Sequence, residues 1–268
     1  PCARPGLDAA GRLPNTVAAP PAAGPTAQGQ RRSRGNGTDG MTVSFVHHRI
    51  SVAPLRWQAV AEWLASRPER LAAAGGALYG IWRNQIGRPR DEITAITAWS
   101  GPVTADAAQA ALTGGAPDVT AATSETMVPT LRPADARPPQ RQGNYAFRWF
   151  VTPEQDWQEF LDLCAQAWPG FEAAYDSQVI GLWRCTGDAC GPAMDEPAGL
   201  GRPGLIRSLL MTRRPNLAMW ERSKLPQGEA ETAVRETLSR RYDLCTWTTV
   251  YTTTLLTAAD TADQARWA

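Results

Sequence analysis

The two histidines of the chain, His47 and His48, are adjacent in the sequence. They lie in a segment rich in β-branched and aromatic residues, which predicts a strand over 42–52. Neighbouring residues of a strand point to opposite faces, so one imidazole should look into the fold and the other toward helices or solvent. An internal repeat places His48 at the position equivalent to Arg148. We therefore interpret His48 as a general base, with the Arg148 cation stabilising an enolate or phenolate. The alternative is that His48 is an ordinary polar strand residue.

Aromatic residues that could form the walls of a binding pocket occur in both halves of the chain. Trp82 and Trp183 occupy equivalent positions, Asn84 shares the strand face of Trp82, and Tyr145 could present a hydroxyl to a substrate. Because Trp also fills large cores, burying about 150–250 Å² of surface without any ligand, packing is the alternative interpretation. We predict that Trp82, Asn84, Trp183 and Tyr145 contact a ligand.

Composition and motifs argue against several other functions. The net charge is +1, which gives no electrostatic reason to bind nucleic acid or an anionic membrane. Of the 27 basic residues only Lys224 is a lysine. Arginine clusters can bind phosphate through a planar fork, but these arginines are spread along the sequence. The motifs of P-loop enzymes, dinucleotide-binding folds, serine hydrolases and zincins are absent.

The five cysteines predict neither a metal site nor an extracellular disulfide framework. Their number is odd, and the pair Cys185 and Cys190 has no matching Cys/His pair. A reduced, cytoplasmic protein is the simpler expectation. The apolar runs are much shorter than the roughly 20 residues that a transmembrane helix needs.

A repeated unit sets the expected architecture. Gly80-Ile81-Trp82-Arg83 returns as Gly181-Leu182-Trp183-Arg184, and an amphipathic helix pattern precedes each copy in the same register. The apolar positions of the two helix patterns are Trp57, Val60, Ala61, Leu64 and Leu71 in the first copy, and Trp157, Phe160, Leu161, Cys164 and Phe171 in the second.

Two units of the same element order follow from the periodicity and the turn residues. The first has expected strands at 42–52, 78–86, 92–99 and 124–131, with helices at 55–67 and 104–112. The second has expected strands at 145–152, 178–186, 205–213 and 246–256, with helices at 154–168, 216–222 and 229–242. Each unit reads β-α-β-β-α-β, the ferredoxin-like order. We predict two tandem units, 41–135 and 142–258, in an α+β fold.

The two units are expected to form a pseudo-twofold α/β barrel. A ferredoxin-like sheet carries helices on one face, and its other apolar face needs a cover. Two units in one chain can cover each other. Residues 1–40 lack Trp, Phe and Tyr and are predicted to be a disordered tail. The biological start is expected near Met41, the upstream residues being an over-extended reading frame or, alternatively, a processed leader. Residues 259–268 are expected to be a C-terminal tail.

The first unit resembles the NIPSNAP family in a glycine-rich turn, a strand with Gly-aromatic-Trp and a later strand ending in Trp. The residues that carry the resemblance are Gly75–Trp82, Ile86-Gly87, Asp91–Trp99, Ser124-Glu125-Thr126 and Leu131-Arg132-Pro133. The resemblance implies the dimeric α/β-barrel group, in which open sheet faces surround a pocket. Relatives in that group include cofactor-free monooxygenases, isomerases, haem-degrading enzymes and dye peroxidases.

The chain departs from the family where a polar pair is expected on the first strand. Family members often begin Tyr-Glu-Leu-Arg, whereas this chain has Tyr145-Ala146-Phe147-Arg148, so only Arg148 of the polar residues is kept. A haem would need an axial ligand, and a histidine on the first strand is not where haem relatives are expected to carry one. We therefore expect no cofactor.

These observations predict a protein of the NIPSNAP type that binds a small apolar or aromatic molecule inside the barrel. The activity expected is that of a cofactor-independent monooxygenase or an isomerase acting through His48 and Arg148. The alternative is a non-enzymatic interaction scaffold or ligand carrier. We expect no nucleic-acid, membrane or metal partner, and a homodimer is left open.

Overall fold

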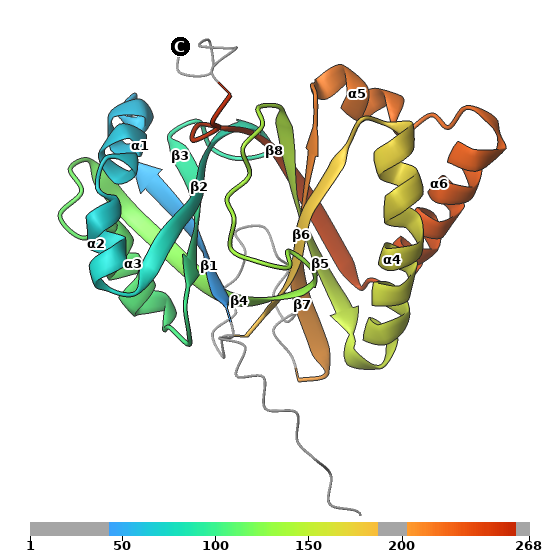
Figure 1. The fold of residues 1–268 in the computed structure, drawn as a ribbon, viewed down its shortest axis with the longest axis horizontal. Helices are drawn as coiled ribbons and strands as arrows, with labels where there is room; N and C mark the ends of the chain where they lie inside the picture. The colour runs from blue at the N-terminus through green and yellow to red at the C-terminus, as the bar shows by residue number, and fades with distance from the viewer. Residues whose placement is uncertain (1–42, 187–202, 261–268) are drawn as a thin grey trace, which may run out of the picture. The chain divides into compact units, whose positions relative to one another are not determined.

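Eight antiparallel strands close into a barrel in the computed structural model, which describes residues 43–186 and 203–260 (Figure 1). These residues all belong to one compact unit, Gly40–Ala268. The tail predicted over 1–40 lies outside the described residues, as does most of the one predicted over 259–268. Around the barrel the strands follow the order β1-β3-β2-β8-β5-β7-β6-β4, and β4 pairs with β1 to close it.

Every strand and helix expected from the sequence is present, with ends displaced by a few residues. The strands are β1 (Ser44–Val52), β2 (Gly76–Ile86), β3 (Glu92–Trp99), β4 (Val119–Arg132), β5 (Asn144–Pro153), β6 (Gln178–Cys185), β7 (Leu205–Arg214) and β8 (Trp247–Leu255). The helices are α1 (Trp57–Ala65), α2 (Pro68–Ala73), α3 (Ala105–Thr113), the 3-10 turn η1 (Glu154–Asp156), α4 (Trp157–Ala174), α5 (Leu217–Arg222) and α6 (Gly228–Asp243).

Local sequence explains where several of these helices begin. The Thr104 hydroxyl accepts a hydrogen bond from the Ala107 amide and so caps α3. Asn216 does the same for α5 through the Met219 amide. Pro68, expected to interrupt or end the first helix, begins α2, where its missing N–H costs nothing. The helix expected to end at Trp168 instead continues through Pro169 to Ala174.

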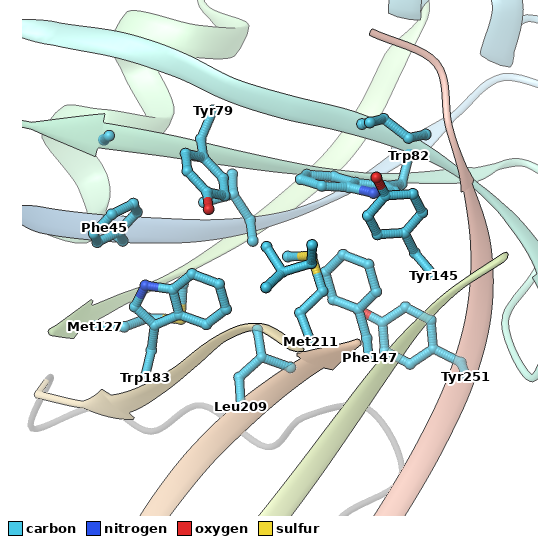
Figure 2. Packing of buried hydrophobic residues seen from close by; sticks show 14 of the residues in the cluster. Phe45, Tyr79, Trp82, Met127, Tyr145, Phe147, Trp183, Leu209, Met211 and Tyr251 are labelled. Atoms are coloured by element: carbon cyan, nitrogen blue, oxygen red, sulfur yellow. The ribbon is translucent and has the colours of Figure 1, made fainter. Parts of the chain in front are cut away.

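Helices cover the barrel on two sides (Figure 1). Helices α1, α2 and α3 bury an apolar layer against one set of strands, and α4 and α6 bury a second layer against another set. A third layer fills the barrel itself (Figure 2). Strand residues alternate between the barrel and a helix layer: on β1, Phe45 lies in the barrel and Val46 lies against the helices. This alternation decides where each candidate residue lies.

The repeated Gly-x-Trp motif has a packing explanation. A Cβ atom added to Gly80 would lie 2.5 Å from Cη2 of Trp82, and one added to Gly181 would lie even closer to Trp183. Both strands change register beside the glycine. Each indole therefore folds back over the glycine two residues before it, inside the barrel. The repeated motif is explained by the packing of the barrel core.

In the described part of the chain, no helix is both long enough and apolar enough to cross a bilayer. No group of three or more His, Cys, Asp or Glu side chains among these residues is placed to hold a metal ion.

Candidate functional site

The structure separates His48 from Arg148. His48 points out of the barrel toward α3, where its Nδ1 lies 2.7 Å from the Ser124 hydroxyl, which in turn donates to Gln109. Arg148 points out of the barrel on another side, beneath α5 and α6. The prediction that these two residues face each other across the barrel is therefore wrong. Both have even residue numbers, whereas on β1 and β5 the residues with odd numbers face the interior of the barrel.

His48 belongs to a closed hydrogen-bonded chain. Its Nε2 lies 2.9 Å from the Thr97 hydroxyl, which accepts a hydrogen bond from the Trp99 indole. Because the Ser124 hydroxyl donates to Gln109, Nδ1 of His48 carries the proton and donates to Ser124. Burial lowers the pKa of His48 to about 3. A neutral imidazole with both nitrogens satisfied is a structural element, not a base near neutrality.

The predicted ligand-contacting residues are core residues of the barrel. The ring centroids of Trp82 and Tyr145 are 6.1 Å apart, and Trp183 packs edge-on against Phe45 at 5.6 Å (Figure 2). Trp82, Tyr145 and Trp183 have essentially no exposed surface. Asn84 donates to the backbone carbonyl of Glu92 at 2.7 Å. Core packing, the alternative interpretation, therefore accounts for the positions of these residues. They fill the space that they were expected to surround.

The histidine that faces the barrel is His47. Its Nε2 lies 3.1 Å from the Tyr251 hydroxyl, and its ring meets Trp149 edge-on with centroids 5.1 Å apart. Burial, together with the nearby cation of Arg88, lowers the pKa of His47 well below its ordinary value. The same burial raises the pKa of Tyr251 to about 12. Both groups are therefore uncharged at neutral pH.

Buried ion pairs surround this histidine. Arg49 pairs with Glu92, whose other neighbour Arg88 lies 4.0 Å away, and Arg207 pairs with Glu125 at 3.1 Å. Each cation therefore has a carboxylate partner, as buried charges normally require.

A pocket of about 270 Å³ lies outside the barrel, between the strands β5, β6 and β7 and the helices α4, α5 and α6. The strands contribute both short side chains, Ala146, Val179 and Thr212, and long ones, Arg148, Leu210 and Arg214. The lining residues are Ala146, Arg148, Trp168, Phe171, Val179, Leu210, Thr212, Arg214, Trp220, Ser223, Lys224, Arg235, Leu238, Arg241 and Tyr242. Of the residues predicted from the sequence, only Arg148 belongs to this pocket.

The pocket gathers cations without anions. Five of its lining residues are arginine or lysine and none is aspartate or glutamate. Arg214 and Arg241 are 8% and 3% exposed. Among the described residues, no carboxylate forms an ion pair with Arg148, Arg214 or Arg241. These three guanidiniums therefore differ from the paired arginines of the barrel.

The local electrostatics reflect this imbalance at Arg148 and Arg214. At Arg241 burial also opposes the charge, but Cys164 and Tyr242 outweigh it and raise the pKa. Burial, reinforced by the charge of Arg148, lowers the pKa of Arg214 to about 10. Burial likewise lowers the pKa of Arg148, and Arg241 acts in the same direction. The Nε atoms of Arg214 and Arg241 are buried without a hydrogen-bond acceptor. An anionic ligand would supply the missing charge and the missing acceptors at once.

Aromatic rings hold the arginines in place. Arg214 lies over Trp220, with its Cζ 4.6 Å from the ring centroid, and over Phe171 at 4.9 Å. Arg148 and Arg241 lie 5.3 Å and 4.9 Å from the centroid of Tyr242. Cation–π contacts of this kind contribute about 0.5–2 kcal/mol each, and they fix the guanidiniums without neutralising them.

Sequence reasoning missed this cluster because its members are far apart in the chain. The arginines are spread along the sequence, but β5, β7 and α6 bring Arg148, Arg214 and Arg241 together. A signal was present on α6, where Arg235, Leu238 and Arg241 have the i, i+3, i+6 spacing of one helix face. Its pairing with β5 and β7 depended on the tertiary fold.

Comparison with known proteins gives structural neighbours only. No protein-family model matches the chain. No curated protein matches it.

The neighbours are distant in sequence. A candidate monooxygenase from Lactobacillus acidophilus is 11% identical, with a TM-score of 0.48, and covers 83% of this chain and 100% of its own. A mutant chlorite dismutase from Candidatus Nitrospira defluvii is 10% identical, with a TM-score of 0.47, and covers 81% of this chain and 92% of its own. An anthrone oxidase-like protein is 12% identical, with a TM-score of 0.45, and covers 81% and 92%. At this level of similarity the neighbours assign no family and no activity, and the NIPSNAP resemblance stays a prediction.

Proposed function

We propose that this protein binds a small organic anion that carries an aromatic or apolar portion. The observation that carries the proposal is the convergence of Arg148, Arg214 and Arg241 on one pocket in which no described residue supplies a carboxylate. An unpaired buried charge costs several kcal/mol. Arg214 and Arg241 are buried, Arg148 is half-buried, and a ligand that supplies the counter-charge would explain why the three converge.

The lining also defines the rest of the ligand. Trp220 and Tyr242 offer ring faces, and Phe171 and Leu238 offer apolar surface. Arginine forks suit the planar oxygens of a carboxylate and the oxygens of a phosphate. The expected ligand is therefore an aryl or alkyl carboxylate or phosphate with its charged end at the arginines.

A binding series tests the proposal. Benzoate and phenyl phosphate are compared with benzamide, a neutral molecule of similar shape, by isothermal titration calorimetry on the full chain. We expect both anions to bind at least about tenfold more tightly than benzamide, because a hydrogen bond to a charged group contributes about 1.5–3 kcal/mol. Equal affinity for the three compounds, or no binding of any, would show that the pocket does not select anions.

The fold-level predictions remain proposals of the same kind. We infer two tandem ferredoxin-like units, 41–135 and 142–258, related by a pseudo-twofold axis, and a NIPSNAP-like ancestry. The supporting observations are the element order and the two indoles folded over equivalent glycines. The cytoplasmic location, the homodimer and the carrier or scaffold alternative are also still predictions. Oxygenase or isomerase chemistry through His48 finds no support, because that imidazole is enclosed against α3.

A further inference from the structure

We propose that Tyr242 is the proton-transferring residue of the pocket and that the pocket acts on carboxylates with an enolisable carbon beside a carbonyl group. This inference rests on the proposed anion-binding function. Arg148 keeps the role predicted from the sequence, in which its guanidinium stabilises an oxyanion. The base is Tyr242 instead of His48.

The position of Tyr242 carries the inference. It lies on α6 and lines the pocket beside Arg148 of β5 and Arg241 of its own helix. The two guanidiniums lie over its ring from two separate elements. A phenol in this position lies within the group of cations that would hold the ligand.

The surroundings favour the phenolate. Burial opposes ionisation, but the charges of Arg241 and Arg148 outweigh it and lower the pKa of Tyr242 below its ordinary value. Arg235 acts in the same direction, and Arg214 faces Tyr242 from β7. The Cys164 and Cys245 thiols lie beside the same arginines, and burial raises the pKa of both.

The other tyrosines behave in the opposite way. Burial raises the pKa of Tyr79, Tyr145, Tyr175 and Tyr251. Since the chain has five tyrosines, Tyr242 is the single one whose surroundings lower its pKa and so favour the phenolate that accepts a proton. A base is most effective when its pKa approaches the working pH.

The reaction is a reversible proton transfer that needs no oxidant. The phenolate oxygen of Tyr242 takes a proton from the carbon next to the carbonyl. The electron pair of that C–H bond forms the enolate C=C bond, and the carbonyl π pair moves to oxygen, where the Arg148 cation stabilises the charge. The ligand carboxylate stays at Arg214. The phenol then returns its proton to the enolate, at carbon or at oxygen, which exchanges or moves the hydrogen.

Phenylpyruvate is a suitable probe because it combines an aromatic ring, a carboxylate and an enolisable methylene. Binding is measured by calorimetry, and exchange of the methylene protons in D₂O is measured by NMR. We compare the full wild-type chain with Tyr242→Phe, which keeps the ring, and with Arg240→Gln, an exposed arginine on the same helix that pairs with Glu159. Ultraviolet titration at the tyrosinate band provides a readout independent of turnover.

We expect wild type and Arg240→Gln to accelerate exchange about a hundredfold or more over buffer. Tyr242→Phe should bind phenylpyruvate with similar affinity, lose the acceleration and lose the tyrosinate that forms at lowest pH. If wild type binds the probe but exchange runs at the buffer rate, the inference is overturned while the proposed function stands. Equal exchange by Tyr242→Phe and wild type would also overturn it. If neither phenylpyruvate nor benzoate binds, the proposed function fails as well.

Discussion

Arg148 and Arg214, on the adjacent strands β5 and β7, share the ring of Trp220: the Cζ atoms lie 6.0 Å and 4.6 Å from its centroid. Burial lowers the pKa of Arg214, and the positive charge of Arg148 acts in the same direction. Folding therefore brings like charges together beneath the helices. Such an arrangement is expected where a ligand, and not the fold, benefits from the charge.

Replacing Arg214 by methionine should stabilise the ligand-free protein and weaken anion binding. The several kcal/mol needed to desolvate an unpaired ion exceed the cation–π contacts of about 1–2 kcal/mol that oppose it. We expect the free energy of unfolding to rise by about 1–3 kcal/mol. Urea denaturation without ligand measures the stability, and calorimetry with benzoate measures the binding.

Arg49→Met is the matched control for that substitution. Arg49 is equally buried but pairs with Glu92 inside the barrel. Removing Arg49 leaves Glu92 only the more distant cation of Arg88, 4.0 Å away, and breaking a buried pair costs about 3–5 kcal/mol. The two substitutions should therefore shift stability in opposite directions. A loss of stability for both would show that Arg214 has a structural role.

Alanine at Gly80 should destabilise the barrel. The added Cβ would clash with the Trp82 indole, which is held inside the packed core. Overpacking of this kind costs about 1–3 kcal/mol. Denaturation of Gly80→Ala, of Trp82→Leu and of the double variant forms a thermodynamic cycle. Because the clash disappears when the indole is gone, the double variant should lose less than the sum of the two single losses. Additive losses would show that the glycine is needed for another reason.

Acid should destabilise the fold through His48. Its pKa falls from 6.5 to about 3 on folding, so the unfolded chain binds this proton first. The stabilising contribution is complete above pH 6.5 and is lost as pH falls toward 3, by about 1.4 kcal/mol per pH unit. His47 acts in the same direction. In His48→Gln, the slope of unfolding free energy against pH between 6 and 4 should be smaller by about one proton. An unchanged slope would mean that His48 is accessible to protons in the folded state.

The fold was predictable because its determinants are local. The alternation over 92–99 matches β3 (Glu92–Trp99) residue for residue. The two Gly-x-Trp motifs marked β2 and β6 because each is a short-range packing unit. Which histidine faces the barrel was not predictable from alternation alone, since alternation gives two opposite faces but not their assignment. The repeat suggested equivalence between His48 and Arg148, and both do point outward, toward different helix layers.

The candidate site was largely hidden because it depends on tertiary proximity. Arg148, Arg214 and Arg241 come from two strands and a helix that the fold brings together. Their spacing in the sequence does not predict that they are neighbours. The lack of a carboxylate among the described lining residues is also a property of three-dimensional surroundings. Only the face of α6 that carries Arg235 and Arg241 was visible as a pattern.

Trp220 should determine whether the pocket prefers aromatic anions. It lies on α5, which has no buried residue of its own, and its ring is shared by Arg148, Arg214 and Lys224. In Trp220→Leu the arginines remain, so the affinity for acetate should change little. The affinity for benzoate should fall by about 0.5–1.5 kcal/mol, the value of an aromatic pair beyond its buried area. Calorimetry with both anions on both proteins gives the ratio directly. If benzoate and acetate lose affinity equally, Trp220 acts by holding the arginines; if only benzoate loses it, the ring contacts the ligand.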